Sequence, residues 1–111
     1  MSHPYVDINA GMTMLGGNKA IYHRLLKTYA SGSLYADAVA AVESGDVAKS
    51  QIALHTLKGA TANLHLEAIY QKSKELEQDI KDSGSMPSAE AMVELANIQD
   101  NTLLEIAAIL A

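Results

Sequence analysis

Apolar residues recur along this chain at three- and four-residue intervals, which is the spacing of one face of an α-helix. The residues between them are mostly good helix formers such as Ala, Glu and Lys, and β-branched runs are scarce. The connections between the periodic segments are short, and residues 83–87 form the one clear loop. We therefore predict an all-α fold, an up-down antiparallel four-helix bundle with a short N-terminal helix.

The pattern divides the chain into five predicted helical segments. They run from the cap Asp7 to Gly16-Gly17, from Lys19 to about Ser44, from Val47 to about Asn63, from Leu66 to about Asp82, and from Ala89 to the C-terminus. Ser31-Gly32-Ser33 is a weak point at which the second segment could kink.

Residues with short polar side chains stand where these segments begin. Asn18, Asp46 and Ser88 are suited to accept a hydrogen bond from the first turn of a helix, so we predict them as N-caps. Gly45 suits a helix end, and Asn63-Leu64-His65 is a predicted turn because Asn and His tolerate a positive φ better than most residues.

The third predicted helix has a core stripe and a separate histidine-bearing face. On a helical wheel the core stripe consists of Val47, Ser50, Leu54, Leu57, Thr61 and Leu64. His55 falls far from this stripe. Around it lie the small or apolar residues Ala48, Ile52, Gly59 and Ala62, with Lys58 at the edge. An exposed helix face is usually charged, so this small apolar patch predicts a docking surface.

Gly59 is the residue of this face that is hardest to explain structurally. A histidine on a helix is often an ordinary surface residue, but a glycine within a helix costs about 1 kcal/mol relative to alanine. The apolar period continues beyond Gly59, so nothing in the local pattern requires a break there. We infer that a partner comes close to the backbone at this position.

Composition restricts the class of protein further. The 111 residues suit a single domain, 1–111, and the absence of cysteine leaves no disulfide or thiolate metal site and fits a cytoplasmic protein. The net charge is −5 without a basic cluster, which disfavours nucleic-acid binding. No apolar run approaches the ~20 residues of a membrane span, and we see no signal peptide. We expect a monomer without membrane contact.

Residues His55-Thr56-Leu57-Lys58-Gly59-Ala60, followed by Thr61-Ala62-Asn63-Leu64, resemble the signature of histidine-containing phosphotransfer (HPt) domains of bacterial two-component phosphorelays. Gly16-Gly17-Asn18 with Tyr22, Leu25, Leu26 and Tyr29 resembles the start of that family, and Leu76-Glu77 its usual Leu-Glu pair. The resemblance spans Asp7 to about Lys81. Members often have glycine at the position of His65 and phenylalanine at that of Tyr29.

The resemblance implies a role for each residue of this face. His55 would accept a phosphoryl group, usually on Nε2, from a receiver-domain aspartate and pass it to another receiver. Lys58 would bring positive charge to the phosphoryl oxygens, and Gly59 would admit the receiver. Glu77 would hydrogen-bond the other ring nitrogen. A neutral imidazole is a competent nucleophile near pH 7, and phosphoryl transfer depends mainly on positioning and charge neutralisation.

The same resemblance implies the partners, which are response-regulator receiver domains and a hybrid sensor histidine kinase. Sequence features of an autonomous kinase, such as a Gly-rich phosphate loop, are missing. We therefore expect a phosphoryl carrier rather than an enzyme, with no cofactor of its own and with magnesium on the receiver. No two histidines lie four residues apart, so we expect no metal site.

Two other functions remain open at this point. The domain could be a docking or inhibitory module that binds a receiver or sensor kinase without being phosphorylated, or a structural bundle segment of a larger sensor. The mixed-charge residues 72–82 read most simply as a solvated helix face, which leaves Glu77 open between a functional and an ordinary role. The sequence names neither donor nor acceptor, input signal nor direction of phosphate flow. The role of His65 and the choice between a free-standing protein and an excised domain also stay open.

Overall fold

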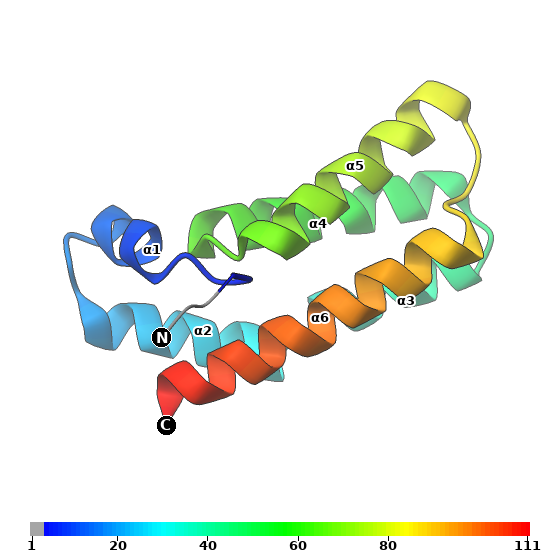
Figure 1. Cartoon of the computed structure of the whole chain (residues 1–111). Helices are drawn as coiled ribbons and strands as arrows, with labels where there is room; N and C mark the ends of the chain where they lie inside the picture. Colours follow the sequence, from blue (N-terminus) through cyan, green and yellow to red (C-terminus); the bar gives the residue numbers. More distant parts are fainter. Residues whose placement is uncertain (1–3) are drawn as a thin grey trace.

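The computed structural model describes residues 4–111, and within this range the chain is helical with no strand (Figure 1). The all-α prediction is therefore confirmed for the described residues. The helices are α1 (Ile8–Met14), α2 (Lys19–Ser31), α3 (Leu34–Glu43), α4 (Val47–Leu64), α5 (Glu67–Ser83) and α6 (Ala89–Leu110).

Local capping explains where four of these helices begin. The side chains of Asp7, Asn18, Asp46 and Ser88 each accept a hydrogen bond from the backbone N–H three residues further on. Each cap satisfies one of the amides that the first turn of a helix leaves without a partner. The predicted N-caps are confirmed, and the other predicted boundaries of α1, α4 and α5 differ from the observed ones by no more than three residues.

The prediction of one continuous helix from Lys19 to about Ser44 is wrong. The chain leaves the helix at Gly32, whose ψ of −178° is extended, and resumes at Leu34, so that α2 and α3 follow one another (Figure 1). A Cβ at Gly32 would lie 3.0 Å from the backbone oxygen of Thr28. Low helix propensity and this close approach together turn the expected kink into a break.

The core lies along α4, which packs against α3 on one side and α5 on the other. α6 covers the opposite side of the molecule, where it contacts α5 and α2. The largest fully buried apolar side chains come from α2, α4, α5, α6, the N-terminal segment and the residue just before α5: Tyr22, Leu26, Leu54, Leu57, Leu66, Ile69, Leu76, Ile80, Leu95, Ile106 and Val6. This core holds α4 and α5 side by side, which sets their facing residues in a defined register.

The N-terminal segment and α1 cover the C-terminal end of α4. A Cβ at Gly11 would clash with the Tyr22 ring, because α1 lies directly on α2 at this point. The Tyr22 hydroxyl donates to the Leu64 carbonyl oxygen (2.9 Å), and the Asp7 N–H donates to the His65 carbonyl oxygen (2.9 Å). These bonds anchor the end of α4. None of the helices in residues 4–111 has the length and apolarity needed to cross a membrane.

Candidate functional site

His55 lies on α4, on the side away from the core. The buried residues of α4 are Ser50, Leu54, Leu57, Thr61 and Leu64, as the wheel predicted, while Val47 is half-buried. The His55 side chain is 67% exposed. Regular helical periodicity is enough to produce this arrangement, because residues buried at three- and four-residue intervals leave His55 on the outer surface.

Glu77 is the partner of His55 and comes from the neighbouring helix α5. Its side chain is 3% exposed, and its Oε2 lies 2.9 Å from His55 Nδ1. Burial by itself would raise the pKa of Glu77, but hydrogen bonds from Lys58 and His55, together with the charges of Lys58 and Lys81, lower it. The ionised carboxylate can only accept hydrogen bonds, so Nδ1 of a neutral His55 carries the proton and Nε2 carries the free lone pair.

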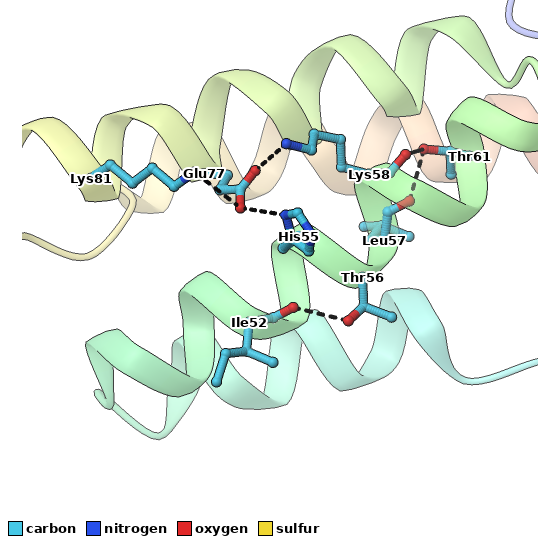
Figure 2. Close-up of polar contacts among 8 residues, drawn as sticks. All are labelled: Ile52, His55, Thr56, Leu57, Lys58, Thr61, Glu77 and Lys81. Atoms are coloured by element: carbon cyan, nitrogen blue, oxygen red, sulfur yellow. Dashed lines mark hydrogen bonds and ion pairs between the residues drawn. The ribbon is translucent and has the colours of Figure 1, made fainter.

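Two lysines approach the same carboxylate from opposite sides (Figure 2). Lys58 Nζ, from α4, lies 2.5 Å from Glu77 Oε1 and its side chain is 24% exposed. Lys81 Nζ, one turn beyond Glu77 on α5, lies 3.7 Å from Oε2 and its side chain is 45% exposed. Buried carboxylates require such partners, because an unpaired charge in the interior is strongly disfavoured. Glu77 thus connects His55 to two positive charges.

The remaining predicted residues surround His55 on the outer face of α4. Ala48, Ile52 and Gly59 are exposed, with Ile52 at 67%, whereas Ala62 is half-buried. A Cβ added at Gly59 would meet nothing within 4 Å, so the fold itself does not require glycine there. That open space is consistent with a close approach from outside the domain.

A shallow hollow of about 310 Å³ lies beside His55. It is lined by Gln51, Ile52, His55, Thr56, Glu77 and Lys81. Within this lining, the Thr56 hydroxyl donates back to the Ile52 carbonyl oxygen on its own helix (3.0 Å, Figure 2). Lys81 therefore belongs to the surroundings of His55, although sequence reasoning placed it in a solvated charged face.

The interpretation of residues 72–82 as a solvated face is wrong for Lys72 and Glu77. Both side chains are buried, Lys72 in contact with Glu94 of α6 and Glu77 beneath His55. The sequence does contain a signal for Lys81, because Glu77 and Lys81 are four residues apart and such pairs are neighbours on a helix. Its relevance depends on the contact between α4 and α5, which the sequence pattern does not specify.

His65, the second histidine of interest, ends α4 in a left-handed conformation with φ of 54°. The predicted positive φ in this turn is confirmed, and it explains why glycine would suit the position. Its Nδ1 lies 2.8 Å from Glu67 Oε1 and its Nε2 lies 2.9 Å from Met14 Sδ. Within residues 4–111, no three His, Cys, Asp or Glu side chains gather as they would around a metal ion.

Comparison with protein families identifies the class to which this arrangement belongs. The model of the Hpt domain family matches residues 30–110. This match covers most of the sequence, and the chain therefore belongs to the Hpt domain family. The family implies a phosphotransfer role in phosphorelays through receiver domains, with its members acting as phosphoryl carriers. No match was found among curated proteins or solved structures.

The extent of this match differs from the resemblance read from the sequence motifs. It includes α6, which the motifs alone described only as a bundle helix, and it begins at residue 30. The residues Gly16-Gly17-Asn18 and most of α2 therefore lie outside the matched region. The His55 motif and Glu77 lie well inside it.

Proposed function

We propose that His55 accepts a phosphoryl group from the phospho-aspartate of one receiver domain and passes it to the aspartate of another. The observation that carries this proposal is the pairing of an exposed imidazole with a buried carboxylate, 2.9 Å apart. The carboxylate holds the proton on Nδ1 and leaves the Nε2 lone pair on the accessible side of the ring. Family membership supports the same role.

The transfer needs no proton movement on the histidine. The Nε2 lone pair forms the N–P bond while the P–O bond to the donor aspartate breaks, and the bonding pair of the P–O bond stays on that carboxylate. The imidazole keeps its Nδ1 proton and becomes positively charged, which strengthens its hydrogen bond to Glu77. When a second receiver aspartate attacks the phosphorus, the N–P bond breaks and the neutral imidazole is restored.

The donor and acceptor receivers would dock on the outer face of α4. Ala48, Ile52 and Ala62 would provide apolar contacts around His55, and Gly59 would let a receiver loop approach the helix backbone. A hybrid sensor histidine kinase is the expected source of phosphate, with magnesium on the receiver. Because this domain brings a nucleophile and a docking face, it acts as a carrier with no cofactor of its own.

Several finer features are part of the same proposal. We propose that residues 1–111 form one domain and that α2 with α3, α4, α5 and α6 serve as the four legs of an up-down antiparallel bundle, with α1 as the short N-terminal helix. A monomer in the cytoplasm, without membrane or nucleic-acid contact, suits a carrier that meets several receivers in turn.

Transfer from a purified, ³²P-labelled receiver tests the proposal. Wild-type protein should acquire base-stable, acid-labile label, and His55→Gln should acquire none. Label that persists in His55→Gln would exclude His55 as the acceptor. Receiver binding by wild-type protein without any transfer in the presence of magnesium would favour the docking or inhibitory module instead.

A further inference from the structure

Lys58 and Lys81 both neutralise Glu77, but their contacts divide them into two kinds. Lys58 Nζ is 2.5 Å from Oε1, a short charge-assisted hydrogen bond to a buried acceptor. Lys81 Nζ is 3.7 Å from Oε2, which is too long for a hydrogen bond. Lys58 is therefore held at Glu77, while the Lys81 ammonium is held only by charge and is the more exposed of the two.

The two lysines also differ in their position relative to His55, and Lys81 is the one on the His55 side of the carboxylate. Lys81 approaches the carboxylate oxygen that also binds His55 Nδ1, whereas Lys58 occupies the other oxygen (Figure 2). Lys81 lines the hollow beside His55, and Lys58 is not among its lining residues. His55 lines the same hollow, so a phosphoryl group on its ring would add negative charge to a surface that Lys81 shares.

We propose that Lys81, rather than Lys58, is the cation that binds the phosphoryl oxygens on His55, and that Lys58 is a positioning residue that holds Glu77. This inference rests on the proposed phosphotransfer function and assigns a residue to it that the sequence motif does not contain. To reach a phosphoryl group, Lys58 would have to leave a buried carboxylate oxygen without its hydrogen bond, which is costly. Lys81 can turn toward the hollow without breaking one.

Phosphorylation by phosphoramidate tests this division without a receiver. The His55 Nε2 lone pair forms the N–P bond as the P–N bond of the donor breaks and ammonia leaves. We expect Lys81→Met to slow phosphorylation of His55 by about tenfold, the usual scale for losing one charge-assisted contact in a partly exposed site. Lys81→Arg should restore most of the rate, because it restores the charge.

Two further variants serve as controls in the same assay. Lys74→Met removes an exposed lysine seven residues earlier on α5, near the Tyr70 ring rather than Glu77, and should leave the rate unchanged. Lys58→Met should slow phosphorylation less than Lys81→Met does. It should instead have the larger effect on unfolding by acid, because it removes the hydrogen bond that helps keep Glu77 ionised.

A spectroscopic measurement separates direct contact from a structural effect. In wild-type protein, NMR of the lysine Hε–Cε groups should show a larger shift for Lys81 than for Lys58 or Lys74 when His55 becomes phosphorylated. The reverse order, or equal rates for wild type and Lys81→Met, would overturn this inference alone. Failure of the wild type to be labelled by phosphoramidate and by receivers would overturn the proposed function with it.

Discussion

His55 and His65 lie ten residues apart, at the middle and the end of α4. The closest polar contact of each side chain is of the same kind. In each, Nδ1 faces a glutamate oxygen, at 2.9 Å from Glu77 for His55 and at 2.8 Å from Glu67 for His65. A histidine–carboxylate pair is therefore not what distinguishes the proposed phosphoacceptor, and the difference must come from the surroundings of each pair.

The two pairs differ in which partner is exposed. His55 is 67% exposed above a carboxylate that is 3% exposed, while His65 is 27% exposed beside a carboxylate that is 43% exposed. The Nε2 of His65 is occupied by Met14, and its backbone carbonyl accepts from Asp7. The proposed phosphoacceptor thus combines an exposed ring with a fixed, buried acceptor on Nδ1, whereas His65 is the less exposed member of its pair and its Nε2 faces Met14.

The largest expected effect is the loss of phosphoryl labelling when His55, but not His65, is replaced. With phosphoramidate or a phosphorylated receiver as donor, His55→Gln should abolish labelling, because glutamine has no nucleophilic nitrogen. His65→Gln should label at nearly the wild-type rate, since the His65 Nε2 already faces Met14. Mass spectrometry of the labelled peptides provides the measurement, and phosphate on His65 would contradict the distinction.

The next largest effect concerns the open space above α4. Gly59→Gln should reduce transfer from a receiver by about a hundredfold, the scale expected when reacting groups are held out of position. Labelling by phosphoramidate should stay within about twofold of wild type, because this small donor does not need to approach Gly59 as closely.

Gly59→Ala is the matched control for this variant. Its Cβ enters open space and should stabilise the folded domain by about 1 kcal/mol in urea unfolding. Receiver transfer at the full wild-type rate in Gly59→Gln would show that no partner approaches the backbone there.

A smaller effect distinguishes the two glutamates. Glu77→Gln should slow phosphoramidate labelling by about tenfold, because the amide no longer stabilises the positive charge that the ring acquires. Glu67→Gln should have almost no effect. The measurement is the rate of phosphohistidine formation by ³¹P NMR, and equal rates for the two variants would remove the proposed role of Glu77.

Glu77 should also affect acid stability. Its pKa is lower in the folded protein than the ordinary 4.5, so the folded state binds this proton less tightly than the unfolded chain does. Its contribution to the free energy of unfolding is complete above pH 4.5 and is lost as the pH falls below that value through the folded pKa. The free energy of unfolding in urea, measured between about pH 3 and pH 6, should therefore depend less on pH in Glu77→Gln than in the wild type.

The smallest expected effect concerns the backbone of His65. At its φ of 54°, an alanine is strained while a glycine is not, so His65→Gly should be more stable than His65→Ala by about 1 kcal/mol in urea unfolding. Both variants lose the contacts with Glu67 and Met14, so their difference isolates the backbone. A more stable alanine variant would contradict the left-handed conformation of this turn.

Much of the fold was predictable because its signals are local. A cap such as Asp46 acts within one turn, and the burial of Leu54 and Leu57 follows from their spacing. The break at Gly32 was foreseen only as a kink, because the tight approach to Thr28 depends on the three-dimensional path of the chain. The burial of Lys72 was missed since its partner Glu94 lies on another helix.

By itself, the sequence determined most of the helix boundaries, the side-chain caps and the outward direction of His55, since helical periodicity depends only on residues within a few turns of one another. It also contained the motif through which the family could be recognised. The tertiary structure alone decided that Glu77 is buried beneath His55 and that Lys58 and Lys81 take different oxygens of its carboxylate. Those contacts depend on the register between α4 and α5, which is set by the packing of the whole core rather than by any local pattern.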